Sequence, residues 1–541
     1  MKTRSLIPVI VSIAILLLTV PPSSSAHTYT QTFYVRPPGV QYGTGDGSDW
    51  ANAFSDLPEK LVRGAKYYMA SGIYSTGTSA YHIFDEAEQG SLYIGVFKAT
   101  PDDHGTDTGW EASFGQGLAQ LGQLQFISGY YEIDGQTGCR DQGHGFKVYI
   151  KDCTEQPTAI VFPWNSASRY VELRHIDMGL CGPTTFTAAQ DVIYSYYGIS
   201  NVIISDCYIH DANRAFIMMI DWSDVLLENN YFARSGRQQE SHALHLRSVS
   251  NVSIRNNVFE DSQSSFINMN EPTDVYIYSN VFKRTPANDQ TVYAVIDNYD
   301  TAINVWIYNN TIYNLQGFNA GVRIVGTLQN VQVYNNLWAK SRANQIQLSG
   351  SHDYNAFYDN WRVDESGNKL YSLDQRMLDD HVEEHLQVIA DNPFVAPDDG
   401  DFRLAFATNP GLTLPAPFDR DPDSVARGWD GVWDRGAYEF VPPLTLHGVP
   451  ADRAIKLSWA VDATLPATMT WRIDYYTNPA TVLTATDPLS ATRAYTLINL
   501  MNGEWYTVTL HAMRGTTVLL SDTVRVMPTG IFVYLPLVLK K

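Results

Sequence analysis

Apolar and polar residues alternate over short stretches in the middle of the chain, and one seven-residue unit returns six times. Each copy begins with Asn or Asp, carries apolar residues at its second and fourth positions, and in five of the six copies ends with Asn. The copies start at residues 201, 224, 251, 274, 304 and 330, which are 23, 27, 23, 30 and 26 residues apart. Alternation with period two predicts a β-strand with one buried face. Its regular return predicts a solenoid in which each repeat forms one coil.

A second short alternating segment precedes the seven-residue unit, for example at residues 242–247 and 265–270. Two or three strands per repeat predict a parallel β-helix, whose neighbouring coils lie about 4.8 Å apart. The closing Asn is expected at a tight bend, where stacked Asn side chains hydrogen-bond backbone groups. The predicted fold class is therefore all-β, with a parallel β-helix as the main body.

The first 26 residues have the features of a secretory signal peptide. Lys2 and Arg4 precede an apolar run from Leu6 to Val20, and Ser24-Ser25-Ala26 is a small-x-small cleavage site. The run is too short to span a bilayer comfortably. We therefore expect cleavage after Ala26, with an uncleaved anchor as the alternative. The expected location is extracellular, either free or attached to the cell surface.

Composition narrows the function classes. The 541 residues include 57 acidic and 37 basic side chains, for a formal charge of −20. Removal of residues 1–26, which carry two basic and no acidic residues, would change the charge to −22. An acidic chain disfavours nucleic-acid binding, because phosphate contacts need a basic surface. A hydrophobic content of 44% excludes a disordered chain. Four cysteines are too few for a disulfide-dense scaffold.

Export would allow the cysteines to oxidise. We expect Cys139 to pair with Cys153 and Cys181 with Cys207, although three pairings are open to four cysteines.

The repeats resemble the right-handed parallel β-helix of the pectate-lyase-like superfamily. Residues 33–36, 43–54 and 67–74 are similar to the start of secreted bacterial β-helix proteins, and residues 400–404 and 433–440 resemble their closing motif. The resemblance covers residues 33–440. It implies the right-handed fold, and it leaves lyase, hydrolase, epimerase and non-catalytic surface protein open as functions.

Residues 443–527 resemble a fibronectin type III domain. Trp459 would be its buried Trp, and the spacing from Leu500 to Tyr506 matches the tyrosine corner, although Asn502-Gly503 replaces the usual Pro. The resemblance implies either a binding module or a plain spacer. Residues 530–541 form an apolar tail that ends in two lysines, which is either a sorting or anchoring signal or a final strand.

Alternate residues of a strand point to opposite faces, so the second strand predicts two exposed rows. The residues assigned to the core are Leu244, Leu246, Ile267, Met269, Ala294, Ile296, Val322 and Ile324. The first exposed row is then His245, Asn268, Val295, Arg323 and Gln347. The second is Arg247, Asn270 and Asp297, with Glu271, Asn298 and Asp300 at the adjoining turn.

These rows suit a polysaccharide, in particular one that contains uronic acids. Arg247 would hold a carboxylate, and His245 or Arg323 would assist proton abstraction in a lyase reaction. A hydrolase would need two carboxylates, and Asp297 with Glu271 is the only pair that we nominate. Glu271, Asp297 and Asp300 are also the expected ligands of a Ca²⁺ ion. The alternative is a polar ladder without function. No pectate-lyase or polygalacturonase motif is found, so no catalytic residue is transferred from those families.

The repeat strand predicts a third row, which is aromatic. Its members are Tyr276, Tyr278, Trp306, Tyr308 and Tyr334. An open row of this kind would stack on sugar rings. Its alternative is burial under residues 351–440 or under the C-terminal domain. The rival to a carbohydrate-active enzyme is accordingly a non-catalytic surface or adhesion protein that displays this row. With either function, the protein is expected to be a monomer.

Overall fold

The computed structural model describes most of the chain between residues 27 and 530. The described ranges are 27–75, 80–150, 158–164, 168–180, 191–235, 242–285, 294–315, 321–342, 345–348, 350–364, 368–461, 469–478, 481–487, 492–515 and 517–530. The predicted signal peptide and the tail from residue 531 lie outside them.

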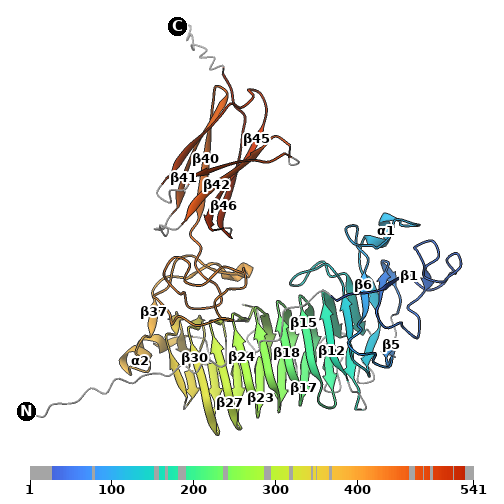
Figure 1. Cartoon of the computed structure of the whole chain (residues 1–541). Helices are drawn as coiled ribbons and strands as arrows, with labels where there is room; N and C mark the ends of the chain where they lie inside the picture. Colours follow the sequence, from blue (N-terminus) through green and yellow to red (C-terminus); the bar gives the residue numbers. More distant parts are fainter. Residues whose placement is uncertain are drawn as a thin grey trace, which may run out of the picture.

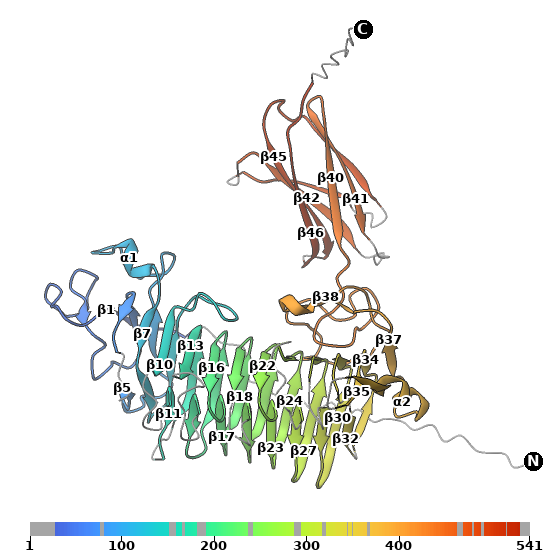
Figure 2. The same ribbon diagram turned by 180° about the vertical axis from the view of Figure 1, so that it is seen from behind.

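Three parallel sheets wind around one another as a right-handed β-helix of about ten turns (Figures 1 and 2). Sheet A consists of β1 (Gln31–Arg36), β2 (Phe54–Ser55), β3 (Ala65–Met69), β6 (Ile94–Lys98), β9 (Tyr131–Asp134), β12 (Arg169–Arg174), β15 (Ser200–Ser205), β18 (Ser223–Glu228), β21 (Ser250–Arg255), β24 (Thr273–Tyr278), β27 (Ala302–Tyr308), β30 (Leu328–Tyr334) and β33 (Ser351–Asp353). The seven-residue units therefore form strands of sheet A, and each coil contains three strands.

The other two sheets complete each coil. Sheet B consists of β4 (Gly72–Ile73), β7 (Ala119–Leu121), β10 (Phe146–Ile150), β13 (Ile176–Leu180), β16 (Tyr208–Ala212), β19 (Tyr231–Ser235), β22 (Val258–Ser262), β25 (Val281–Lys283), β28 (Thr311–Tyr313), β31 (Leu337–Ala339), β34 (Ala356–Tyr358) and β37 (Gln387–Ile389). Sheet C consists of β5 (Ala80–Phe84), β8 (Gln123–Phe126), β11 (Ile160–Phe162), β14 (Ile193–Ser195), β17 (Ile217–Ile220), β20 (Leu244–Arg247), β23 (Ile267–Asn270), β26 (Ile296–Asn298), β29 (Gly321–Ile324) and β32 (Gln345–Leu348).

The repeated Asn and Asp residues of the seven-residue units bend the backbone of each coil at two positions. In all six units the first and sixth residues have φ between 52° and 58°. This left-handed region suits Asn and Asp better than most residues, because their short polar side chains hydrogen-bond locally. The first residue, for example Asn251, lies inside a strand of sheet A, at a position that the pairing between β18 and β21 skips. The sixth residue, for example Asn256, begins the turn into sheet B.

The closing Asn points inward and forms the predicted ladder. The Nδ2 group of Asn280 donates to the backbone oxygen of Ile254, 2.8 Å away, and to Oδ1 of Asn310, 3.0 Å away. The backbone N–H of Asn257 donates to Oδ1 of Asn280, and this pattern runs from Asn230 to Asn355. Each Asn thereby satisfies backbone groups that the corner leaves without a sheet partner.

The last rungs of this ladder and of a shorter second one are closed by carboxylates. Glu383 accepts hydrogen bonds from the backbone N–H and the side-chain amide of Asn355, at 3.1 and 2.7 Å. Asp374 does the same for Asn360, at 3.0 and 2.9 Å. Asp374 lies in α2 (Leu373–Asp379), which begins after the N-cap Ser372. The helix α2 therefore helps to cap the last coils of the solenoid.

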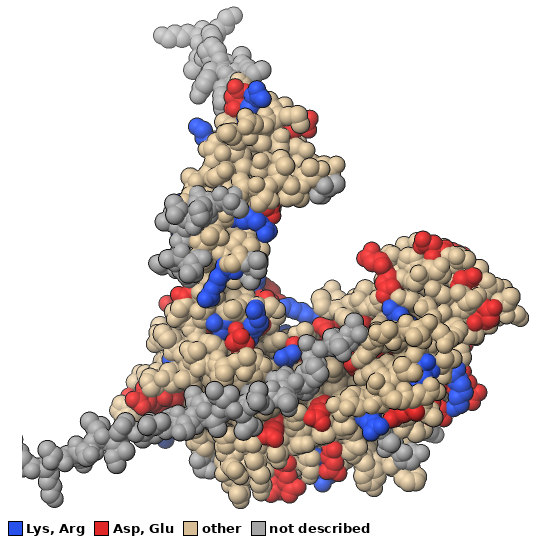
Figure 3. Space-filling view, viewed as in Figure 1, with Lys and Arg blue, Asp and Glu red and all other residues tan. Residues whose placement is uncertain are grey.

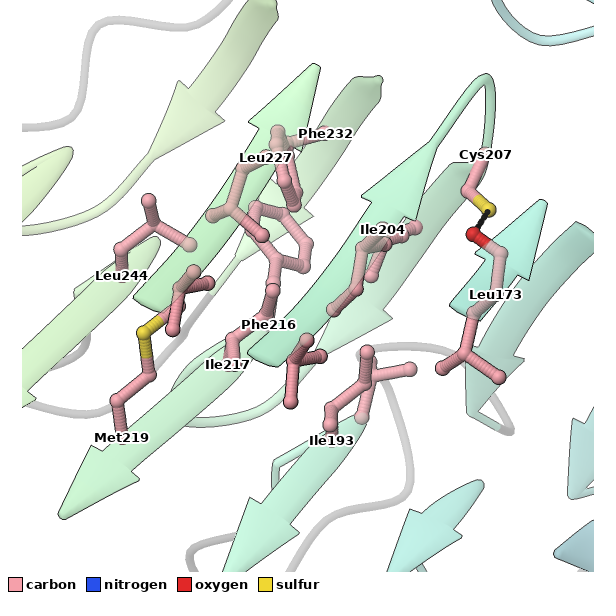
Figure 4. Packing of buried hydrophobic residues seen from close by; sticks show 14 of the residues in the cluster. Leu173, Ile193, Ile204, Cys207, Phe216, Ile217, Met219, Leu227, Phe232 and Leu244 are labelled. Atoms are coloured by element: carbon pink, nitrogen blue, oxygen red, sulfur yellow. Dashed lines mark hydrogen bonds between the residues drawn. The ribbon is translucent and has the colours of Figure 1, made fainter. Parts of the chain in front are cut away.

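The interior is a continuous column of aliphatic and aromatic side chains. Phe232, Phe259 and Phe282 stack on consecutive coils, with ring centroids 4.6 and 4.9 Å apart. The eight residues assigned to the core from the sequence are all buried. Figure 4 shows this packing around Ile204, Phe216 and Leu227.

Cys207 occupies the ladder position of the first unit, in place of Asn. Its thiol is buried and contacts the backbone oxygen of Leu173 (Figure 4) and that of Ser205. Cys207 and the exposed Cys139 are both free thiols. Each predicted disulfide needs one of them, so neither pairing is present; Cys153 and Cys181 lie outside the described residues. The ladder position points into the apolar column, where a thiol fits without a partner.

Short elements extend from the two ends of the solenoid. The helix α1 (Ala112–Gly115) lies near its N-terminal end. Near the C-terminal end, β35 (Trp361–Val363) pairs with β36 (Lys369–Ser372), and β38 (Phe394–Ala396) pairs with β39 (Asp401–Leu404) around η1 (Pro397–Asp399). The chain then crosses to the C-terminal domain.

The C-terminal domain contains two antiparallel sheets. One has the order β40 (Leu444–Ala451), β41 (Ala454–Val461), β44 (Ala494–Ile498), and the other β43 (Leu483–Asp487), β42 (Thr470–Tyr476), β45 (Tyr506–Arg514), β46 (Thr517–Val526). Trp459 is buried between them, as predicted, and the Tyr506 hydroxyl accepts a hydrogen bond from the backbone N–H of Met501. The fibronectin type III assignment itself stays a prediction.

Acidic and basic side chains are interspersed over the face drawn in Figure 3, rather than gathered into one basic patch. In the described part of the chain, no helix is both long and apolar enough to cross a membrane.

Candidate functional site

The outward face of sheet C carries a row of polar side chains from consecutive coils. Strand pairing aligns Met218, His245, Asn268, Asp297 and Arg323, and Gln347 follows in register. Arg247 and Asn270 are aligned in the next row. In both ribbon views the labelled strands β17 and β23 lie along the lower side of the solenoid, away from the C-terminal domain (Figures 1 and 2).

In the strand β26, the residue that joins the first exposed row lies two positions later than predicted. Val295 is buried in the core, whereas Asp297 belongs to the first row, beside Asn268 and Arg323. The reason is that Asn298 takes an inward position, where its amide donates to the backbone oxygen of Asp300, 2.7 Å away. The alternation of apolar and polar residues does not distinguish a register with Val295 beside Asn268 from one with Asp297 there, because Ile296 points inward in both.

His245 is a neutral, half-buried base on this face. Burial lowers its pKa to about 4, and the nearby guanidinium groups of Arg247 and Arg214 act in the same direction. Its Nε2 lies 3.3 Å from Oδ1 of Asn270, which can only accept a hydrogen bond. The ring proton therefore lies on Nε2, and Nδ1 keeps a lone pair. The neighbouring His242, whose ring centroid is 5.4 Å away, is also neutral because burial lowers its pKa to about 3.

Arg247 is the cation available to a ligand. Its side chain is exposed, and it forms no ion pair within the described ranges. Arg214, by contrast, is bound to the buried Asp191, whose Oδ1 lies 2.9 Å from the Arg214 Nε. A guanidinium without a partner beside a neutral imidazole is suited to bind a carboxylate.

Arg323 is already occupied. Its Nε and Nη2 donate to the two oxygens of Asp297 at 2.8 and 2.6 Å, which is a bidentate pair. Burial raises the pKa of Asp297, and the ion pair only partly opposes this rise. The Arg323 guanidinium also lies 4.3 Å from the ring centroid of Tyr299. The sequence had led us to expect that Arg323 assists proton abstraction. Its guanidinium is already bound to Asp297, so it shapes the face and is not free for that role.

Glu271 and Asp297, the predicted hydrolase pair, are held by different neighbours. Glu271 lies at the corner after β23, with φ of 53°, and accepts a hydrogen bond from the Ser248 hydroxyl at 3.1 Å. Asp297 is aligned with Asn268, three residues before Glu271, so about 10 Å of strand length separates the two backbone positions.

The three expected calcium ligands do not fit a metal ion either. Throughout the described residues, which include Glu271, Asp297 and Asp300, no three His, Cys, Asp or Glu side chains are grouped so that they could hold one. Asp297 is bound by Arg323, and Asp300 accepts a hydrogen bond from the next backbone N–H, that of Thr301.

Four exposed aromatic residues beside the sheet C strands were missed by the sequence reasoning. Trp164 lies just beyond β11, Tyr196 and Tyr197 follow β14, and Tyr299 follows β26. Their exposed fractions are 72%, 49%, 61% and 49%. Their position in the sequence could have indicated them, because all four lie one or two residues beyond the end of a sheet C strand. The alternation inside the strands does not reveal residues that lie beyond the strand ends.

The aromatic row predicted on sheet A is covered. Leu414, Phe418 and Trp433 pack on it, and Tyr276, Tyr278 and Tyr308 are only 5%, 2% and 3% exposed. The ring of Phe418 meets those of Tyr278 and Tyr308 edge-on, both at 4.9 Å. Trp306 and Tyr334 are partly buried against the same cluster. Of the two alternatives, burial under residues 351–440 is therefore the one that the structure has, and the row is not an open stacking surface.

The face as a whole spans several coils. From β11 to β29 it crosses six strand spacings, or about 29 Å. Aromatic side chains dominate the end near β11 and β14. His245, Arg247, Asn268 and Asn270 lie in the middle, and the Asp297–Arg323 pair with Tyr299 lies at the other end.

The fold defines the class as a right-handed parallel β-helix protein. A family model described as "Right handed beta helix region" matches residues 191–362. No curated protein matches the sequence.

Similar solved structures share little sequence with this chain. PfbA, a surface adhesin of Streptococcus pneumoniae, is 13% identical over 55% of this chain and 82% of its own, with a TM-score of 0.27. A GH136 lacto-N-biosidase from Eubacterium ramulus is 13% identical over 60% and 68%, with a TM-score of 0.28. A tailspike of Acinetobacter baumannii bacteriophage Fri1, a capsular polysaccharide depolymerase, is 11% identical over 85% and 73%, with a TM-score of 0.24. At these scores no function transfers to this chain.

Proposed function

We propose that the protein is exported and binds a carboxylate-bearing polysaccharide along sheet C. One observation supports this proposal: exposed aromatic rings follow strands of sheet C, the same sheet that carries the exposed Arg247, which has no ion pair among the described residues. Sugars present flat apolar faces to aromatic rings and hydroxyl groups to polar side chains. Trp164, Tyr196 and Tyr197 would stack on one part of the chain, and Arg247 would bind a uronate carboxylate in another.

The charge of the protein is compatible with such a ligand. Two acidic polymers repel at long range, but at physiological ionic strength this repulsion is screened beyond about 8 Å. Arg247 acts within that distance, and two carboxylates of this part of the solenoid are already paired, Asp191 with Arg214 and Asp297 with Arg323. Attachment to the cell surface through the C-terminal tail, and a monomeric state, complete the proposal.

Binding is tested with a panel of polysaccharides that contain or lack uronic acids. Trp164→Ala should weaken binding to every ligand of the panel by about tenfold, because a stacking contact is lost. Arg247→Gln should weaken binding only to the uronates, by a similar factor, and should remove its salt dependence. Arg403→Gln is a matched control, because Arg403 is exposed but lies in β39 and binds Asp401. Equal binding by wild type and both variants would reject the proposal.

Lyase chemistry is a second candidate, favoured by the neutral His245 beside Arg247. Nδ1 of His245 would take the proton from the carbon next to a carboxylate held by Arg247. The electron pair would then form a carbon–carbon double bond as the glycosidic oxygen leaves. The ultraviolet absorbance of the unsaturated product is the readout. Activity should fall only below about pH 4, where His245 becomes protonated, and His245→Gln should abolish it. Silence on every uronate, with binding intact, would leave the non-catalytic function.

A further inference from the structure

The second outward row of sheet C places one arginine midway between two exposed tyrosines. Strand pairing aligns Ile220, Arg247 and Asn270 on consecutive coils. The same register, carried past the strand ends, aligns Tyr196 with Ile220 and Tyr299 with Asn270. Both tyrosines are exposed. Each of them therefore lies two coils from the arginine, or about 10 Å along the solenoid axis.

Both tyrosine rings lie over the outward face of the sheet. The ring centroid of Tyr196 is 4.8 Å from that of Tyr194, which alternates with buried neighbours in β14 and points outward. The ring centroid of Tyr299 is 4.3 Å from the guanidinium of Arg323, a member of the first outward row. The two rings are thus on the same side of sheet C as the arginine between them.

This spacing fits a sugar chain that runs along the solenoid axis. Neighbouring coils lie about 4.8 Å apart, and a pyranose ring with its glycosidic oxygen has about the same length. An extended chain would therefore place one sugar over each coil. A sugar that is bound by its carboxylate to Arg247 then has its two neighbours over Ile220 and Asn270, whose side chains carry no charge. The next sugars in each direction lie over the two tyrosines, where they can stack.

Acidic side chains flank the arginine on both neighbouring coils. Asp221 comes directly after β17 and Glu271 directly after β23, and both are exposed. The backbone N–H of Asp221 donates to the backbone oxygen of Arg247, 2.9 Å away. Glu271 reaches back to the coil of Arg247, where it accepts the hydrogen bond from the Ser248 hydroxyl. A carboxylate on either neighbouring sugar would therefore lie beside an acid, within the range of about 8 Å over which charges act at physiological ionic strength.

We infer that the preferred ligand is a heteropolysaccharide in which each uronate is flanked by uncharged sugars, and that polymers of adjacent uronates bind weakly. The inference rests on the proposed binding of glycans to sheet C and names the class of glycan. Arg247 attracts one carboxylate, whereas Asp221 and Glu271 repel carboxylates on the two adjoining sugars. Tyr196 and Tyr299 bind the sugars beyond these. Repulsion of the wrong ligand contributes to specificity as much as attraction of the right one.

The test varies the spacing of the carboxylates on one polymer backbone. Homogalacturonan is used with all of its carboxylates free, with part of them methyl-esterified at random, and with all of them esterified. Hyaluronan, in which glucuronate alternates with an uncharged sugar, is the fourth probe. Calorimetry should show that hyaluronan and the partly esterified polymer bind at least about tenfold more tightly than the free polymer. The fully esterified polymer should bind more weakly than the partly esterified one, because it has no carboxylate for Arg247.

The double variant Asp221→Asn, Glu271→Gln removes the repulsion and keeps the shape of the corner. Asn tolerates the left-handed φ of Asp221, and Gln can still accept the hydrogen bond from Ser248. The variant should bind free homogalacturonan about tenfold more tightly than the wild type does, and hyaluronan with little change. The matched control is Asp452→Asn, Glu504→Gln, which removes two exposed acids from the C-terminal domain and should leave all four affinities unchanged.

Two results would overturn the inference and leave glycan binding in place. In the first, free homogalacturonan binds the wild type as tightly as the partly esterified polymer does. In the second, the double variant and its control change the affinity for free homogalacturonan equally, so that only the total charge matters. Binding of none of the four polymers would reject the proposed function and the inference with it. Thermal unfolding of each variant shows that the fold is retained.

Discussion

Sheet A and sheet C present outward rows from the same coils, yet residues 412–433 cover the row on sheet A, whereas exposed side chains lie beside the row on sheet C. On sheet A the row from Tyr276 to Tyr334 is aromatic, and residues 412–433 return across it. On sheet C the row from His245 to Arg323 is polar, with exposed aromatic residues at its edge. Strand periodicity decides which side chains point outward. Whether they meet solvent depends on chain segments that return much later in the sequence.

The largest effect on stability is expected from loosening residues 412–433, which form the cover over the aromatic row of sheet A. Phe418→Ala removes a buried ring that packs edge-on against Tyr278 and Tyr308. The free energy of unfolding should fall by about 3–5 kcal/mol, as is usual for the loss of a buried Phe. Chemical denaturation measures it. Tyr299→Ala on sheet C is the control and should change stability by less than about 0.5 kcal/mol. Similar losses in the two variants would remove the distinction between the faces.

A smaller loss is expected when the ion pair on sheet C is broken. Arg323→Ala leaves the carboxylate of Asp297, which is only 2% exposed, without its bidentate partner. The free energy of unfolding should fall by about 3 kcal/mol. The double variant Arg323→Ala, Asp297→Ala should recover most of this loss, because no buried charge remains. A double-mutant cycle measures the coupling, and additive losses would show that the pair does not act as a unit.

The cover on sheet A should also respond to pH, because buried carboxyl groups hold it. One buried arginine, Arg427, lies among Asp421, Asp434 and Glu439. Its Nη2 donates a hydrogen bond to the hydroxyl of Ser279, at the corner after β24, over 3.2 Å. Burial raises the pKa of Asp421 and of Asp434 to about 6, and that of Glu439 to about 8.

All three pKa values are higher in the folded state, so the folded protein keeps protons that the unfolded chain has already released. The stability from this cluster is complete below about pH 4 and is lost as the pH rises through 6 and 8. Glu439→Gln keeps a neutral group there and should be more stable than the wild type by about 2 kcal/mol at pH 9. Thermal unfolding between pH 5 and 9 checks this, and parallel curves for the two proteins would contradict it.

The smallest effects on stability are expected for two tryptophan variants, one from sheet A and one from beside sheet C. Trp306→Ala should cost about 2 kcal/mol of stability and leave glycan binding unchanged, because Trp306 stacks on Tyr276 at 4.6 Å beside the cover. Trp164→Ala should change stability by less than about 0.5 kcal/mol and weaken glycan binding. Denaturation and binding are measured on both variants. The opposite pattern would assign the ligand to sheet A.

Much of the fold was predictable from local pattern. The seven-residue unit predicted the strands of sheet A, and its closing Asn predicted the ladder from Asn230 to Asn336. These features repeat every coil, so each is supported several times in the sequence. The register of Asp297 was not predictable, because Val295 and Asp297 have the same parity and only the inward turn of Asn298 separates them.

The candidate site was predicted only in part. His245, Arg247, Asn268 and Asn270 do share a face, because they occupy equivalent positions on adjacent strands. Trp164, Tyr196 and Tyr197 were missed, since they follow the strands and have no periodicity of their own. The disulfides were wrong because the ladder position of Cys207 points into the core.

By itself, the sequence determined the solenoid, its corners and the direction of most side chains. These depend on interactions between neighbouring residues and between equivalent positions one coil apart, and both recur in the sequence. Only the tertiary structure decided which outward row is covered and which carboxylate has a partner. The cover over sheet A depends on contacts between segments more than a hundred residues apart, such as Trp433 with Asn309, which no local pattern contains. The Asp297–Arg323 pair joins neighbouring coils, and it depends on a register that alternation does not specify.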